Sequence, residues 1–242
     1  MIGELIPRSS LSDVDIAAMY ELFRTHFDNV DAHGFRTDLG DKQWIIRIRS
    51  RRSLLGFTSL RYVNMEHAGE QLKILYSGDT IVAPEARRST LFARSWISAV
   101  RQLSGYYDAQ EFYWLLLVSG FRTYRFLPVF WEEFFPVYDR ITPVFEQRRI
   151  DSAARLLFND HYLADRGIVR FDRPQILKAD QGGIAESRLR DPHVANFSAR
   201  NPGFWQGDEL VCWTRLSEAN LTAAGRRMWQ ACDAERPVSL AG

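Results

Sequence analysis

The stretch ILYSGDTIVAPEARRSTLFARSWISAVRQL, residues 74–103, organises the predicted fold. Residues 74–82 are rich in apolar, β-branched and aromatic side chains and carry one charge, Asp79, which is typical of a strand inside a sheet. Pro84 ends this strand because proline has no N–H for a ladder. From Leu91 onward apolar residues recur at helical spacing. The stretch therefore predicts a strand, a short turn and an amphipathic helix.

The turn between this strand and helix is polar and basic, with the sequence Arg87, Arg88, Ser89, Thr90. Unpaired backbone N–H groups and the positive end of the helix dipole favour an anion at such a position. Two guanidinium groups would lie beside that anion. The turn is therefore a predicted anion site.

The bulk properties restrict the class of protein. The 242 residues are 46% hydrophobic and 13% aromatic, which excludes a disordered chain, and the net charge of +1 argues against nucleic acid as a partner. Cys212 and Cys232 lack metal-ligand spacing, which fits a reducing cytoplasm. The N-terminus has no signal-type apolar run, and the apolar run at 112–118 is too short to span a bilayer. We therefore expect a cytoplasmic protein with no membrane partner.

Other elements follow from hydrophobic periodicity. In the N-terminal half we expect a strand at 3–6, a helix capped by Ser12 or Asp13, a short helix or loop at 31–41, a hairpin over 43–63, a buried strand at 111–119 and helical spacing over 121–135 as far as Pro136. Beyond it we expect a helix within 141–159, strands at 167–171 and 207–216, a loop-rich region at 173–206 and a helix at 217–231. We expect a core over residues 1–150 and a C-terminal extension over 151–242, packed on that core.

This element order, together with VAPEARRSTLFARSW at 82–96, resembles the GNAT superfamily of N-acyltransferases. In that family Val-x-Pro-Glu-x-Arg leads into a turn that binds the pyrophosphate of acyl-CoA, and Val82, Pro84, Glu85 and Arg87 match it. The resemblance covers residues 3–145 in element order, and the motif itself about a dozen. It implies an α+β fold with a mixed, mostly antiparallel sheet flanked by helices and split like a V between the strands at 74–82 and 111–119.

The resemblance also implies where a donor would bind. The pantetheine of coenzyme A or of an acyl-carrier protein would lie in the split, hydrogen-bonded near Ile81 and Val82. Its phosphate would lie at the basic turn formed by Arg87, Arg88, Ser89 and Thr90.

Two departures from the family pattern leave alternatives open. The glycine positions of the family's turn correspond here to Arg88, Thr90 and Phe92, whose bulk obstructs a diphosphate cradle but leaves room for the single phosphate of a carrier protein's arm. Phe130 stands where the family often has the tyrosine that protonates the leaving thiolate. Either another group does this, or none is needed, or the chemistry has been lost.

Four residues are candidates for catalysis. Asp79 is either the general base or a structural acid in a bulge. Beyond the buried strand, Tyr124 is a candidate acid for the thiolate, Ser119 a hydrogen-bond donor and Arg122 an anchor for a carboxylate substrate. The alternative for these three is a capped helix start with solvated arginines. The aromatic stretch 121–135 either lines an acyl tunnel or partner surface or belongs to the core. The polar segments 200–203 and 207–209 either form the loop before a strand or lie over a pocket and close it.

Other chemistries are disfavoured by missing motifs. The five histidines have no metal-binding spacing, so no metal site is expected, and the chain lacks the hydrolase Gly-x-Ser-x-Gly, Gly-x-Gly-x-x-Gly and Walker motifs. The leading hypothesis is an acyltransferase that moves an acyl group from a pantetheine thioester to an amine of a small metabolite or amino acid. The alternatives are a GNAT-shaped binding or regulatory module without catalysis, and another reaction on the scaffold such as decarboxylation or lactone formation. The sequence predicts neither the acceptor nor the oligomeric state.

Overall fold

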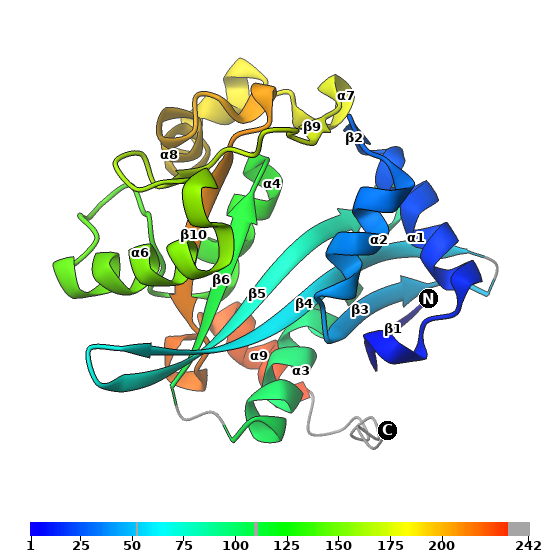
Figure 1. Ribbon diagram of the computed structural model, residues 1–242, viewed down its shortest axis with the longest axis horizontal. Coiled ribbons are helices and arrows are strands. Elements are labelled where there is room, and N and C mark those ends of the chain that lie inside the picture. The colour runs from blue at the N-terminus through cyan, green and yellow to red at the C-terminus, as the bar shows by residue number, and fades with distance from the viewer. Residues whose placement is uncertain (52, 109–110, 232–242) are drawn as a thin grey trace.

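The computed structural model describes residues 1–51, 53–108 and 111–231 (Figure 1). Its main sheet has the order β1-β3-β4-β5-β6-β10-β8-β7. The strands are β1 (Ile2–Pro7), β3 (Trp44–Arg49), β4 (Leu54–His67), β5 (Glu70–Val82), β6 (Phe112–Val118), β7 (Tyr162–Leu163), β8 (Ile168–Val169) and β10 (Glu209–Arg215). Every neighbouring pair is antiparallel except β5 and β6, which are parallel. The α+β fold with a mixed, mostly antiparallel sheet is therefore confirmed.

Helices cover both faces of this sheet. They are α1 (Asp13–Arg24), α2 (Ala32–Gly40), α3 (Leu91–Tyr106), α4 (Phe121–Tyr124), α5 (Phe126–Phe130), α6 (Val144–Phe158), α7 (Ala179–Gly182), α8 (Pro192–Arg200) and α9 (Ala223–Ala231). Ile45 packs with α1 and α2, whereas its neighbour Ile46 packs with α3. Ile74 packs with α6, whereas Leu75 packs with α3. Since side chains alternate between faces, α1, α2 and α6 share one face and α3 lies on the other.

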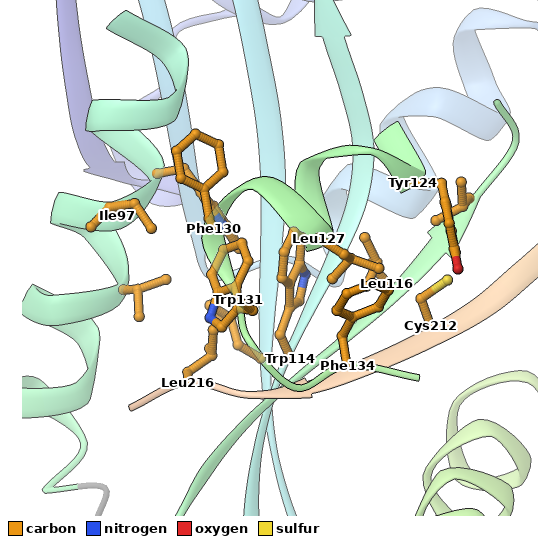
Figure 2. Packing of buried hydrophobic residues seen from close by; sticks show 14 of the residues in the cluster. Ile97, Trp114, Leu116, Tyr124, Leu127, Phe130, Trp131, Phe134, Cys212 and Leu216 are labelled. Atoms are coloured by element: carbon orange, nitrogen blue, oxygen red, sulfur yellow. The ribbon is translucent and has the colours of Figure 1, made fainter. Parts of the chain in front are cut away.

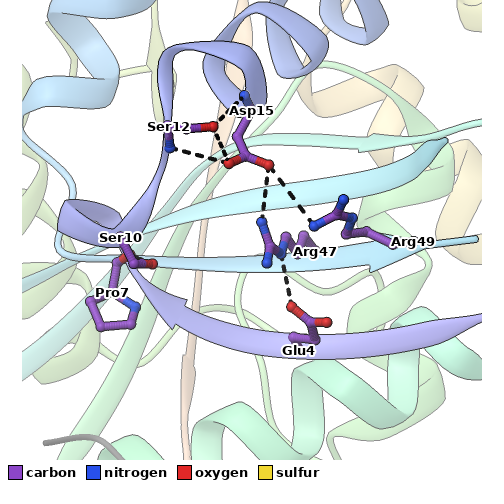
Figure 3. Close-up of polar contacts among 7 residues, drawn as sticks. All are labelled: Glu4, Pro7, Ser10, Ser12, Asp15, Arg47 and Arg49. Carbon is purple, nitrogen blue, oxygen red and sulfur yellow. Dashed lines mark hydrogen bonds and ion pairs between the residues drawn. The ribbon is translucent and has the colours of Figure 1, made fainter. Parts of the chain in front are cut away.

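A polar network fixes the N-terminal helix to the sheet (Figure 3). Ser12 caps α1 as expected, and its hydroxyl and the Asp15 carboxylate form a capping box. The hydrogen bond from Ser12 lowers the pKa of Asp15, and Arg47 and Arg49 lower it further. Arg47 on β3 contacts Glu4 of β1 at 2.9 Å and Asp15 at 3.2 Å. One guanidinium therefore joins β1, β3 and α1.

The sheet splits between β5 and β6. Their pairing runs from Lys73 opposite Phe112 to Ser77 opposite Leu116 and then stops, although β5 continues to Val82. The β4–β5 pairing is irregular between Thr58 and Leu60, close to the point where β5 leaves β6. The V-shaped split implied by the family resemblance is therefore confirmed.

Residues 121–135 differ from the predicted helix. The helical backbone ends at Phe130, well before Pro136, because Trp131 is extended and forms a bridge with Leu221. Phe135 forms a second bridge with Trp213. Pairing with the C-terminal part of the chain thus overrides the helical spacing of this stretch.

The C-terminal part contributes strand β10 to the main sheet. The predicted helix within 141–159 is α6, and the strand predicted at 207–216 is β10, which pairs with both β6 and β8. The region 173–206 is less loop-like than predicted, because it contains α8 and strand β9 (Ile176–Leu177). Helix α9 begins only at Ala223, after a 3₁₀ turn.

The boundary near residue 150 stays a prediction; helix α6 runs across it. Cys232 lies outside the described residues.

Candidate functional site

A cleft of about 900 Å³ passes through the split in the sheet. It has a polar half on the face of α2 and α6, with Asp79 and Glu209, and an apolar half on the face of α3, with Trp96 and Trp114. Its volume lies at the upper end of the range for small-molecule sites. Strand β5 contributes one wall of the cleft from Tyr76 to Val82.

Two carboxyl groups in the polar half have strongly raised pKa values. Burial raises the pKa of Asp79 to about 7, and the charge of Asp38 adds to this while Lys42 opposes it. Burial also raises the pKa of Glu209 to about 8, with a further contribution from the charge of Asp79. A hydrogen bond with Ser119 acts in the opposite direction on Glu209. The two carboxyl groups are thus electrostatically linked across the cleft.

Lys42 lies close enough to Asp79 for its charge to act on that carboxyl group. Its side chain is 2% exposed, and its ammonium group donates to Oδ1 of Asp38 at 2.6 Å and to the Asp38 carbonyl at 3.1 Å. A Cβ at Gly78 would come within 2.9 Å of Lys42 Cε and 2.8 Å of Ser59 Oγ. The glycine lets the lysine approach β5 closely, beside the catalytic candidate Asp79.

The apolar half is lined by side chains from three helices and β6: Phe92, Ala93 and Trp96 of α3, Phe126 and Phe130 of α5, Met228 of α9, and Trp114 of β6. Figure 2 shows Trp114 and Phe130 within the surrounding core. Nε1 of Trp114 donates a 2.8 Å hydrogen bond to Oγ of Ser77. Because Ser77 is in the last pair between β5 and β6, this bond lies at the apex of the split.

The basic turn is built without the family's glycines. It begins with a 3₁₀ helix, Pro84–Ala86, and none of residues 84–90, all of which the structure describes, has a positive φ. Ser89 Oγ accepts a hydrogen bond from the Leu91 N–H at the start of α3. The backbone conformation of this turn therefore does not require glycine.

Arg87 is held by protein groups rather than free for a ligand. Its Nε donates to the Val82 carbonyl at 3.0 Å, and its Nη2 lies 3.0 Å from Nε2 of His26 and donates to Oε1 of Gln181. Burial and the charge of Arg122 lower the pKa of Arg87. The Val82 carbonyl is consequently engaged by the protein itself.

Arg88 and Arg122 are exposed, as is Arg87, and all three line the cleft. Arg122 donates to the Gln181 carbonyl, and its guanidinium carbon lies 4.9 Å from the ring centroid of Phe121. Thr90, Ile81 and Val82 also line the cleft. The residues predicted to hold the donor therefore surround one opening.

Two short paired strands and helix α7, which we together call the strap, connect the two arms of the split. Strand β2 (Phe27–Asp28), which follows α1, pairs antiparallel with β9, and Figure 1 shows both with α7 where the arms end. A Cβ at Gly120, after β6, would lie 3.0 Å from Cδ2 of Leu177. Gln181 of α7 contacts both Arg87 and Arg122. The strap thus covers the cleft between the ends of β5 and β6.

The structure brings Asp79, Ser119 and Arg122 to the cleft but leaves Tyr124 in the core. Tyr124 donates a 2.6 Å hydrogen bond to the Pro136 carbonyl and accepts one from Asn196 at 2.7 Å. Figure 2 shows it beside Cys212. Burial raises the pKa of the Tyr124 hydroxyl above its ordinary value. Tyr124 does not line the cleft, so we do not retain it as the thiolate acid.

Glu209 and Lys42 were not predicted as site residues. Glu209 reaches the cleft only because β10 pairs with β6, a long-range pairing that no local pattern announces. The available signal was the concentration of polar residues at 200–203 and 207–209, which we interpreted as a possible cover for a pocket without naming Glu209 as a site residue.

Neither a metal centre nor a membrane span is found among the described residues. No group of three His, Cys, Asp or Glu side chains there could hold a metal ion. No helix in the same ranges is long and apolar enough to cross a bilayer.

Comparisons with known proteins give similarities at the level of solved structures. No protein-family model and no curated protein matches the chain. The structure is similar to the GNAT family N-acetyltransferase YhbS from Escherichia coli in complex with CoA (16% identity, 52% of this chain and 68% of that chain, TM-score 0.39). It is also similar to NAA60 from Arabidopsis thaliana in complex with a bisubstrate analogue (16% identity, 56% and 89%, TM-score 0.40).

A third similar structure is a conserved protein of unknown function from Enterococcus faecalis, described as a probable N-acyltransferase (11% identity, 89% of this chain and 66% of that chain, TM-score 0.44). All three TM-scores lie below 0.5, so the chemistry of this chain is inferred from its own residues. The strand order and the split between β5 and β6 make the fold GNAT-like.

Proposed function

We propose that the protein is an N-acyltransferase that moves an acyl group from a pantetheine thioester to an amine of a small metabolite or amino acid. One observation carries the proposal: the cleft passes through the split sheet, with arginines at its mouth and two carboxyl groups of raised pKa inside it. The part of β5 that no longer pairs with β6 runs from Ser77 to Val82. Its length is about 17 Å, at about 3.3 Å per residue. An extended pantetheine arm fits such a length.

Asp79 is the proposed general base. A pKa of about 7 lets the carboxylate take a proton from the amine near neutral pH, which an ordinary aspartate with its lower pKa does poorly. The amine nitrogen then forms a bond to the thioester carbonyl carbon, and the carbon–sulfur bond breaks to release the thiolate. Lys42 and Asp38 hold the surroundings of Asp79 in place.

Glu209 is the proposed acid, in place of the family's tyrosine. Its pKa of about 8 leaves it largely protonated at pH 7 and matches the value of about 8.5 for a free thiol. It can therefore give its proton to the departing thiolate, and a proton passing from Asp79 to Glu209 restores the starting state. Two carboxyl groups whose environments set different pKa values can divide acid and base roles in this way. Ser119 orients Glu209 through their hydrogen bond.

The donor is proposed to be a phosphopantetheine thioester, on coenzyme A or on an acyl-carrier protein, with its phosphate beside Arg88 and Arg122. Ser89 and Thr90 lie in the same opening. Because Arg87 is engaged by Val82 and Gln181, its proposed role is to hold the turn rather than to bind the phosphate. The cytoplasm remains the proposed compartment.

The test is a panel of acyl-CoA and acyl-carrier-protein donors with amine and amino-acid acceptors, read by mass spectrometry of the amide product. We expect amide formation with at least one pair, lost in Asp79→Asn. Absence of transfer across the panel, together with absence of any donor-induced rise in melting temperature, would overturn the proposal. Donor binding without turnover would instead favour the alternative of a binding module without catalysis, which the engaged Arg87 and the missing glycines also motivate.

A further inference from the structure

We propose that the apolar half of the cleft holds a medium- or long-chain fatty acyl group of the donor, rather than an acetyl group. This proposal rests on the proposed function, because it names the acyl class that the same site would transfer. It concerns the lobe formed by α3, α5, α9 and Trp114, which we call the aromatic lobe.

The side chains that define the aromatic lobe are aromatic or aliphatic. Of the described side chains that form it, namely Phe92, Ala93, Trp96, Trp114, Phe126, Phe130 and Met228, none is charged. The rings form a connected wall, with centroid distances of 4.5 Å for Trp96 and Trp114, 6.1 Å for Trp114 and Phe126, and 4.5 Å for Phe126 and Phe130. Phe92 joins this wall, 6.4 Å from Phe126. Apolar surface of this kind is stabilised when a ligand of matching chemistry displaces water from it.

The lobe is poorly suited to the pantetheine arm itself. An amide-bearing arm needs hydrogen-bond partners when it leaves water. Among the side chains of the lobe, only the two indoles carry a polar atom, and Nε1 of Trp114 already donates to Ser77. Nε1 of Trp96 has no partner within the part of the chain that the structure describes. The backbone of β5 beyond Ser77, which no longer pairs with β6, can supply partners for the arm instead. The lobe is then left for a group without polar atoms.

The lobe is continuous with the proposed reaction centre. Trp114 and Ser77 form the apex of the split, and Asp79 follows two residues later on β5. A chain attached to a carbonyl carbon near Asp79 can therefore enter the lobe without crossing the sheet elsewhere. Met228, which also lines the cleft, is a flexible side chain that adapts to chains of different length.

The structure separates two roles within the aromatic stretch 121–135. Phe121, Phe126 and Phe130 line the cleft, whereas Leu127 and Trp131 are buried in the core without lining it. The two readings of this stretch, tunnel and core, thus apply to different residues of it. The cleft-lining set is the one that a fatty chain would contact.

The experiment compares acetyl-, butyryl-, octanoyl- and palmitoyl-pantetheine, with unacylated pantetheine as reference, using the full chain. Melting temperature measures binding, and kcat/KM with the best acceptor measures transfer. Each buried methylene is expected to improve affinity and kcat/KM roughly three- to fourfold until the lobe is full. Equal responses to acetyl and octanoyl donors, or to acylated and unacylated pantetheine, would overturn the proposal.

Two variants add bulk inside and outside the lobe. Ala93→Phe fills the lobe from α3, so the ratio of octanoyl to acetyl kcat/KM should fall at least tenfold. Val129→Phe adds a ring at a position that is 41% exposed on the outside of α5, and the ratio should stay at its wild-type value. A ratio unchanged by Ala93→Phe contradicts the proposal.

The two proposals fail separately. Chain-length-dependent rises in melting temperature without any transfer would preserve the acyl lobe and remove the catalytic function. Equal kcat/KM values for transfer of acetyl and octanoyl would support the catalytic function and contradict the acyl lobe.

Discussion

Nε1 of Trp114 donates a 2.8 Å hydrogen bond to Oγ of Ser77, and both residues are buried at the point where β5 and β6 separate. This bond connects Trp114, which belongs to the aromatic lobe, to β5, the strand that carries Asp79. It therefore fixes both halves of the cleft relative to each other.

Removal of this bond should weaken the fold. Trp114→Phe leaves the buried Ser77 hydroxyl without its donor, which costs about 1–3 kcal/mol for the unsatisfied group in addition to the lost packing. Urea unfolding measures the loss. The double variant Trp114→Phe with Ser77→Ala removes the orphaned hydroxyl, so it should be less destabilised than the sum of the two single variants. Simple additivity would show that the bond contributes no coupling.

Replacement of Asp79 by asparagine should lower kcat/KM about a hundred- to ten-thousand-fold, because the base is lost while the shape of the side chain is kept. The melting temperature should not fall. Glu66→Gln on the exposed part of β4 is the matched control and should keep full activity. Wild-type turnover in Asp79→Asn would show that this carboxylate is a structural acid.

The pH profile should be bell-shaped if the two carboxyl groups divide the work as proposed. The rate rises as Asp79 loses its proton near pH 7 and falls as Glu209 loses its proton near pH 8. Glu209→Gln should lower the maximum and abolish the fall on the alkaline side. A kcat/KM profile from pH 5.5 to about 9.5 tests this; an alkaline limb that persists in Glu209→Gln would assign it to another group.

Stability should fall as pH rises from about 4 to about 8. In the unfolded chain both carboxyl groups have a pKa near 4, whereas in the folded chain those of Asp79 and Glu209 are about 7 and about 8. Within this window the folded state binds more protons, so the free energy of unfolding decreases with pH. Glu209→Gln should flatten the decrease, as followed by melting temperature at constant ionic strength. An identical slope in the variant would refute the raised pKa.

The two arginines of the turn should respond differently to substitution. Arg88 is exposed, so Arg88→Ala should raise the KM for the donor with little change in melting temperature, and high salt should reduce the difference from wild type. Arg87→Ala removes contacts to Val82, His26 and Gln181 and should lower the melting temperature. Denaturation and donor titration of both variants decide between these roles. A loss of stability in Arg88→Ala equal to that in Arg87→Ala would contradict this division.

The local elements were predictable because their signals are local. The apolar run of β6, the Ser12 cap and the strand ended by Pro84 each depend on a few adjacent residues. Helix α8 also had such a signal, which the prediction of a loop-rich region over 173–206 missed: Asp191 caps it and Pro192 occupies its first turn.

The composition of the site was only partly predictable, since it depends on pairing between distant strands. Asp79 was recognised as the one charge within residues 74–82, but Glu209 joins it through β10. Tyr124 follows Ser119 and Arg122 closely in sequence, yet the turn of α4 directs it into the core beside Phe197. The prediction grouped Tyr124 with Ser119 and Arg122 because they are close in sequence, but helix α4 places Tyr124 in the core and the other two at the cleft.

The position of β10 has a consequence for any shortened form of the chain. Residues 112–118 of β6 are almost entirely apolar, and β10 covers their outer edge with backbone hydrogen bonds. A fragment ending near residue 150 would expose this edge, and a bare hydrophobic edge strand recruits other chains into aggregates. The last third of the sequence thus covers the edge of β6 against pairing with other chains, and it also contributes Glu209 to the cleft.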